Sequence, residues 1–184
     1  MRTLSDNIFD LVQNSIRAKA REIQVSIEED TSKNLFRIII KDDGQGVRPD
    51  QLSKIKDPFF TSRPNTTRKV GLGLALMDAT CQQSGGTLSI ESKYRFGTTI
   101  TALLEHDNID RPPLGNLPDM FSSIMISTIE NRIIWKLEHI VNGKRYQLKN
   151  RATLDELNFL SYAEPGVKER LVQFILRKEK SLGI

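Results

Sequence analysis

The stretch Phe36-Arg-Ile-Ile-Ile-Lys-Asp-Asp-Gly-Gln-Gly46 decides how this chain can fold. Its first half is a short apolar run bounded by charged residues, which is typical of a buried strand. The run passes directly into Asp42, Gly44 and Gly46, and the two glycines allow the backbone to approach a flat ligand closely. A carboxylate at a strand end can accept a charge-assisted hydrogen bond from an exocyclic amine. The pattern therefore indicates either a ligand site or an ordinary Asp/Gly turn.

A helix is predicted upstream of this stretch, over residues 4–19. Apolar residues recur there at helical spacing: Leu4, Ile8, Leu11, Val12 and Ile16. Thr3 is placed to cap the helix, with Asp6 three residues later. The opposite side carries a polar stripe: Asn7, Asp10, Asn14 and Arg17. The stripe is either a solvated face or part of a site, because an Asn oxygen can ligate Mg²⁺ and the neighbouring Asp and Arg can hold a water and a phosphate.

Two further motifs follow downstream. Asp57-Pro-Phe-Phe60, after a candidate short helix at 51–55, leads into a basic loop at 61–69 that contains no acidic residue. Val70-Gly-Leu-Gly-Leu74 then opens a helix predicted for residues 72–83. Glycines at a helix N-terminus expose amide donors and the positive end of the helix dipole, which attract anions. Neither a Walker A motif nor a complete dinucleotide fingerprint is present, so the motif predicts an anion site of a different kind.

The remaining chain divides at a proline-rich stretch. Strands are predicted for residues 23–27, 36–40, 87–92 and 98–104. Residues 105–118 contain a Pro-Pro pair and read as a junction. Beyond the junction the pattern predicts a helix at 119–129, a hairpin of 133–141 and 144–149 turning at Asn142-Gly143, and helices near 153–161 and 167–180. We therefore expect a domain at 1–104 and a small α/β extension of unknown role at 119–184.

Composition narrows the function classes. The 184 residues carry a formal net charge of +4, with 15 basic and 12 acidic side chains in residues 1–104 and 12 and 11 in residues 105–184. Neither part is strongly basic, which argues against nucleic acid as the primary ligand. No apolar run approaches the roughly 18 residues of a membrane span, and the single cysteine, Cys81, excludes an intramolecular disulfide. We expect a cytoplasmic protein with no membrane partner.

Four motifs in this order resemble the N, G1, F and G2 boxes of the GHKL superfamily, which includes gyrase-type topoisomerases, a heat-shock chaperone family, sensor histidine kinases and MutL proteins. They are Asp10-Leu-Val-Gln-Asn14-Ser-Ile-Arg17, Asp42-Asp-Gly44-Gln-Gly46, Asp57-Pro-Phe-Phe60 and Gly71-Leu-Gly73-Leu. The resemblance covers about residues 4–104. It implies the Bergerat ATP-binding fold, an α/β two-layer sandwich with helices on one face of a mixed sheet, here with the small C-terminal α/β extension.

The resemblance also implies roles for single residues. Asn14 would be the Mg²⁺ ligand and Asp42 the adenine reader, with Thr98 supporting Asp42. The other expected contacts to ATP come from Gly44 and Gly46 at the base, from the backbone of Gly71, Leu72 and Gly73 at the phosphates, and from Lys69 and Arg17 as cations. In hydrolytic members a Glu four residues before the metal Asn is the general base, and here that position holds the shorter Asp10. Lys69 likewise stands where the G2 box usually has its leading glycine, so both departures weaken the expectation of rapid hydrolysis.

The resemblance favours a kinase of stand-alone form. The chain begins at the N box, so we expect no phosphoacceptor-histidine helix, and His106 and His139 are expected to be structural. The leading hypothesis is a Mg-ATP-dependent kinase acting on a protein partner, similar to the anti-sigma-factor serine kinases. The alternatives are an ATP-gated binding module or slow ATPase switch of the MutL type, and a degenerate domain that serves as a scaffold. The sequence leaves the partner's identity and a homodimer open.

Overall fold

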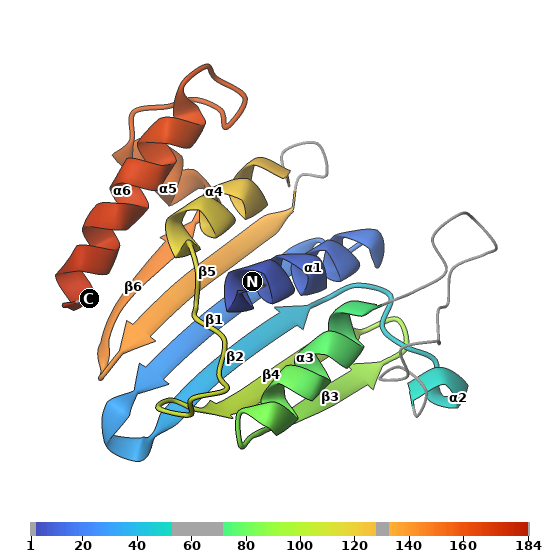
Figure 1. Ribbon diagram of the computed structural model, residues 1–184. Coiled ribbons are helices and arrows are strands. Elements are labelled where there is room, and N and C mark those ends of the chain that lie inside the picture. Colours follow the sequence, from blue (N-terminus) through green and yellow to red (C-terminus); the bar gives the residue numbers. More distant parts are fainter. Residues whose placement is uncertain (1–2, 53–71, 128–132, 184) are drawn as a thin grey trace.

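The computed structural model describes residues 3–52, 72–127 and 133–183, and Figure 1 shows their arrangement. The helices are α1 (Leu4–Arg17), α2 (Pro49–Leu52), α3 (Leu72–Gln83), α4 (Leu117–Ser127), α5 (Asn150–Glu156) and α6 (Val167–Leu182). The strands are β1 (Glu22–Asp30), β2 (Leu35–Asp42), β3 (Thr87–Lys93), β4 (Gly97–Glu105), β5 (Ile134–Val141) and β6 (Lys144–Lys149). The fold is therefore α+β, as predicted, and each predicted strand in these ranges is present.

One mixed sheet of six strands organises the molecule, in the order β3-β4-β2-β1-β5-β6. β1 and β5 pair in parallel, and every other neighbouring pair is antiparallel. Helices α1, α3, α4 and α6 lie over one face of this sheet (Figure 1). This is the two-layer arrangement predicted from the motifs. Among the described residues, no helix combines the length and the apolar character that crossing a membrane requires.

The sheet face under the helices is apolar along most of its length. On β2, Phe36, Ile38 and Ile40 alternate into the core and are at most 1% exposed. The next position in this alternation is Asp42, which is 8% exposed. A strand with period-two alternation places these four side chains on the same face. The apolar face thus ends at one buried carboxylate.

Helix α1 begins where the sequence predicted. The Thr3 hydroxyl accepts a hydrogen bond from Asp6 N, and the Asp6 carboxylate accepts one from Thr3 N, which is a complete capping box. The helix ends at Arg17, two residues before the predicted boundary, and Lys19 has a φ of +59° in the left-handed region. Helix α5 also differs from its prediction. It starts at Asn150 and ends at Glu156, and Asn158 has a φ of +58°, so the helix predicted for 153–161 cannot continue through that position.

The C-terminal strands extend the same sheet as the N-terminal ones. β5 lies beside β1 in register from Glu22↔Ile134 to Glu29↔Val141, and β6 adds the last edge. The junction is held to α1, because Leu4 N donates to Pro113 O at 3.0 Å and Ser5 N donates to Leu114 O at 2.8 Å. The C-terminal extension therefore shares one sheet with the N-terminal part. A division of function at residue 104 stays a prediction.

Candidate functional site

Asp42 is held at the end of β2 by two hydrogen bonds. Its Oδ2 accepts one from Ser15 Oγ at 2.7 Å, and its Oδ1 accepts one from Gly44 N at 2.9 Å. A carboxylate has about four acceptor positions, so this one, although buried, retains capacity for a ligand donor. Ser15 was not among the predicted site residues. Its signal in the sequence is a hydroxyl on the buried side of a helix, next to the predicted ligand Asn14.

Close backbone packing surrounds Asp42. Gly97 has a φ of +115°, and a Cβ there would lie 2.0 Å from the carbonyl oxygen of Asp42. Gly46 has a φ of +61°, and a Cβ there would lie 2.2 Å from the carbonyl oxygen of Lys93. Side chains cannot occupy such positions without displacing the backbone. Gly46 of the Asp42 motif and Gly97 at the start of β4 therefore let the end of β2 pack closely against the β3–β4 turn.

Hydroxyl groups complete this polar end of the sheet. Thr98 is the cross-strand partner of Asp42 on β4, and its Oγ1 lies 2.9 Å from the Oγ of Ser92 on β3. The Ser92 hydroxyl donates to Gly97 O at 3.0 Å and accepts from Val47 N at 2.9 Å. The structure thus brings the predicted Thr98 next to Asp42 and adds Ser92, which sequence reasoning missed. A serine in an alternating strand carries no signal of its own.

The polar stripe of α1 faces the start of α3. A Cβ at Gly73 would lie 3.7 Å from Asn14 Nδ2 and 3.7 Å from Asp10 Cβ, so the missing side chain leaves α3 directly against these two residues. Asn14 is half-buried, Asp10 is exposed, and Arg17 Nη1 donates to Asn14 Oδ1 at 2.7 Å. The amide, the carboxylate, the guanidinium and the first turn of α3 therefore meet along one edge of α1. The first amides of a helix carry a partial positive charge, and anions are favoured there.

Part of the predicted site lies outside the described residues. This applies to Lys69, Gly71, the Asp57-Pro-Phe-Phe60 motif and the basic loop. Leu72 is the first residue of α3. Within the described ranges, no group of three or more His, Cys, Asp or Glu residues is placed to hold a metal ion. A cation at Asn14 would therefore depend on ligand and water oxygens, as Mg²⁺ commonly does.

Comparison with known proteins identifies the family. The sequence model of the family described as "Histidine kinase-, DNA gyrase B-, and HSP90-like ATPase" matches residues 2–108. The chain belongs to this ATPase family. The match contains every predicted site residue and ends just after β4.

Sensor histidine kinases share this ATPase segment. The chain is 31% identical to the sensor histidine kinase ZraS of Escherichia coli over 112 residues, which cover 61% of this chain and 23% of ZraS. It is 30% identical to the histidine protein kinase DivJ of Caulobacter vibrioides, over 56% of this chain and 18% of DivJ. Sporulation kinase B of Bacillus subtilis is also 30% identical, over 56% of this chain and 24% of that kinase. The chain thus spans less than a quarter of the length of each relative.

A solved structure extends the fold likeness beyond the family segment. The crystal structure of the N-terminal domain of a DNA repair protein has a TM-score of 0.55 to this chain at 18% identity. The alignment covers 91% of this chain and 58% of that one. At this identity the likeness concerns the fold alone. The likeness in fold therefore reaches much of the C-terminal part, beyond the family match at residues 2–108.

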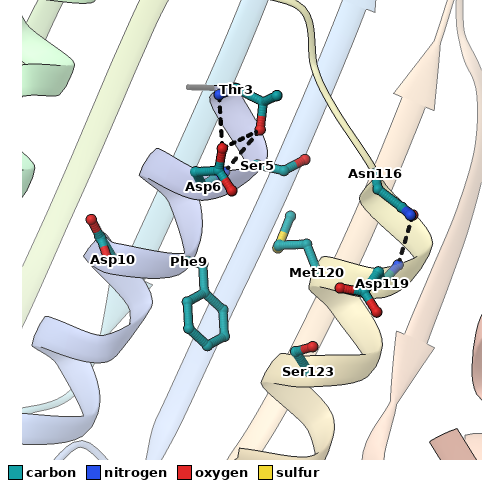
Figure 2. A pocket seen from close by; sticks show the side chains of 9 residues that line it. All are labelled: Thr3, Ser5, Asp6, Phe9, Asp10, Asn116, Asp119, Met120 and Ser123. Atoms are coloured by element: carbon teal, nitrogen blue, oxygen red, sulfur yellow. Dashed lines mark hydrogen bonds between the residues drawn. The ribbon is translucent and has the colours of Figure 1, made fainter. Parts of the chain in front are cut away.

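A groove beside the predicted site separates α1 from α4. It has a volume of about 300 Å³, and Asp10 forms part of its rim. Figure 2 shows Phe9 and Met120 lying between the two helices, with Asp10 on the side of α1 that faces away from α4. The wall formed by α4 lies beyond residue 108, where the family match ends. The C-terminal part therefore shapes the surroundings of the predicted catalytic carboxylate.

Proposed function

We propose that this chain binds Mg-ATP and phosphorylates a partner protein. The observation that carries the proposal is the buried carboxylate of Asp42, which ends an otherwise apolar sheet face and keeps acceptor capacity beside Thr98. A buried carboxylate is costly unless hydrogen bonds compensate it. Two hydrogen bonds compensate Asp42, and the acceptor positions that remain fit a ligand that donates to it.

The polar end of the sheet fits an adenine ring. Asp42 would accept a hydrogen bond from the exocyclic amine, and Gly44 and Gly46 would lie against the ring. Thr98 would support the contact, and Ser15 orients the carboxylate through its own hydrogen bond. A Cβ at Gly46 would lie against the carbonyl oxygen of Lys93, so this glycine holds the loop beside Asp42 close to the β3–β4 turn.

The edge of α1 fits a polyphosphate with its cation. Asn14 would ligate Mg²⁺, and Arg17, which contacts Asn14, would neutralise phosphate charge. The backbone of Leu72 and Gly73 at the start of α3 would donate to phosphate oxygens, together with the predicted Gly71 and Lys69. Bound Mg-ATP would supply the phosphoryl group, and the chain would supply position and charge.

Asp10 is the candidate catalytic residue. It is exposed at the rim of the groove between α1 and α4, one helical turn from Asn14. From there it would orient an acceptor hydroxyl and receive its proton. The acceptor side chain of a partner would approach Asp10 on the side of α1 that faces away from α4 (Figure 2). The proposal includes a functional boundary at residue 104. It also includes a cytoplasmic location, because ATP is available there.

Calorimetry of ATP binding tests the site. Asp42→Asn should abolish ATP binding, because an amide places a donor where the adenine amine also donates, and Asn14→Ala should remove the dependence on Mg²⁺. Asp50→Asn, which changes an exposed carboxylate in α2, is the matched control and should bind like the wild type. Unchanged Mg-ATP binding in both site variants contradicts the proposed site.

A labelling experiment separates the function classes. The protein is incubated with γ-labelled ATP and a cell lysate, in parallel with Asp10→Asn. Label on a partner protein that Asp10→Asn fails to transfer supports the kinase. Released phosphate without labelled protein supports an ATPase switch of the MutL type. ATP binding with neither product supports a nucleotide-gated binding module.

A further inference from the structure

The β3–β4 turn gathers cations and aromatic rings on one exposed surface. We call Arg48, Lys93, Tyr94, Arg95 and Phe96 the basic–aromatic surface. Phe96 is 69% exposed and Tyr94 is 38% exposed. The other exposed large hydrophobic residues of the described chain each come from a different segment. Single exposed apolar side chains are ordinary, but two in one turn mark a candidate interaction site.

The cations of this surface lie over the rings. Lys93 Nζ is 4.2 Å from the Phe96 ring centroid, and Arg48 Cζ and Arg95 Cζ are each 5.5 Å from the Tyr94 centroid. Hydrogen bonding from Arg48 and then from Arg95 lowers the pKa of the Tyr94 phenol. Within the described residues, none of these three cations forms an ion pair with a carboxylate. Two guanidinium groups on one ring repel each other, so an anion bound between them would stabilise both.

The turn presents these side chains on a fixed backbone. Arg95 N donates to Gln45 O at 2.7 Å, and Phe96 N donates to Lys93 O at 2.9 Å. Arg95 has a φ of +68°, a conformation that glycine or asparagine adopts more easily. The backbone conformation of the turn therefore does not require an arginine at position 95. We attribute the choice of arginine to the role of its side chain on this surface. A surface ordered in advance loses little entropy when it binds.

We propose that the basic–aromatic surface docks an acidic segment of a protein partner. Carboxylates of the partner would bind Arg48 and Arg95, and an apolar side chain would pack on Phe96. Tyrosine and arginine are the residue types that dominate protein-protein hot spots. Single-stranded nucleic acid fits less well, because bases stack on free ring faces and Tyr94 already has two guanidinium groups over its ring. The surface contains neither Asp10 nor Asn14, so docking does not depend on phosphoryl transfer.

Fluorescence anisotropy with the full chain tests the docking chemistry. The probe is a fluorescein-labelled peptide, Glu-Asp-Leu-Glu-Phe-Asp-Glu, and its neutral counterpart carries Gln and Asn in place of Glu and Asp. We expect the acidic peptide to bind at least about tenfold more tightly than the neutral one, and more weakly as salt is added. ATP binding is measured on the same samples by calorimetry, so failure of docking and failure of the ATP site are read separately.

Variants locate the binding to the turn. The double variant Arg48→Ala/Arg95→Ala should weaken peptide binding at least about tenfold, and Phe96→Ser about fivefold. Arg145→Ala, which removes an exposed arginine from the β5–β6 hairpin, is the matched control and should bind like the wild type. Four results would overturn the proposal: equal binding of the neutral peptide, an equal loss in Arg145→Ala, stronger binding of an oligothymidine, or an anisotropy change due only to self-association.

Discussion

Replacing His139 with glutamine tests the buried ionic network that joins α6 to the sheet. His139 is fully buried on β5. Its Nδ1 lies 3.0 Å from Glu179 of α6, and its Nε2 lies 3.0 Å from Glu29 of β1. Burial alone would lower the pKa of His139, but hydrogen bonds to Glu179 and Glu29, with their charges, raise it from 6.5 to about 9. The imidazole is therefore a cation between two carboxylates at neutral pH.

The size of this contribution follows from the pKa difference. A raised folded-state pKa stabilises the folded protein fully below the unfolded pKa of 6.5, and the stabilisation is lost as the pH rises through about 9. At about 1.4 kcal/mol for each tenfold difference in proton affinity, the full contribution is about 3 kcal/mol. About 2 kcal/mol of it should disappear between about pH 7 and pH 9.5.

Urea denaturation across this pH range measures the effect. Trp135 is the only tryptophan and is 1% exposed. It lies on β5, the strand that carries His139, so its fluorescence reports unfolding of this region. The free-energy difference between wild type and His139→Gln should shrink by about 2 kcal/mol from about pH 7 to pH 9.5. His106→Gln is the control, because it removes the other imidazole that contacts Glu29. Parallel curves for wild type and His139→Gln would show that His139 is not charged in the folded protein.

Four further substitutions, one of them a control, test the site and the elements that hold it by urea denaturation. Ser15→Ala removes a buried hydrogen bond to Asp42 and should lower the free energy of unfolding by about 1–3 kcal/mol; no loss would mean that Asp42 is held without it. Gly97→Ala should cost more than about 2 kcal/mol, whereas Gly143→Ala, at a similar positive φ but in open space, should cost less. Thr3→Ala removes the capping box of α1 and should cost about 1 kcal/mol, with faster amide exchange in the first turn.

Local elements could be predicted because their signals are local. The capping box of Thr3 and the apolar spacing after it lie within one helix, and both fixed the start of α1. The Asn142-Gly143 turn between two alternating runs located the β5–β6 hairpin for the same reason. Predicted boundaries failed where a single residue left the helical conformation. Lys19 adopts a left-handed conformation just after the end of α1, and Asn158 does so just after α5, where apolar residues continue at Phe159 and Leu160.

Long-range pairing could not be predicted. β5 follows β1 by more than a hundred residues and pairs with it in parallel. The sequence of neither strand indicates which other strand it pairs with. The sequence therefore suggested an appendage where the structure has two more strands of one sheet. Ser15 and Ser92 escaped prediction for a related reason. The Ser15 hydroxyl matters because the distant strand β2 brings Asp42 to it, and the Ser92 hydroxyl matters because the neighbouring strand β4 places Thr98 opposite it.

The two polar ends of the helix-covered sheet face show how a ligand site differs from a structural network. At the His139 end, both ring nitrogens are hydrogen-bonded to carboxylates, and the Tyr146 hydroxyl donates to Glu179. No ring nitrogen is left to accept a phosphoryl group, so His139 stabilises the fold. At the other end, the donors to Asp42 among the described residues are Ser15 Oγ and Gly44 N. Both clusters are buried and polar, and the acceptor capacity that remains at Asp42 is the reason we propose the binding site at its end of the sheet.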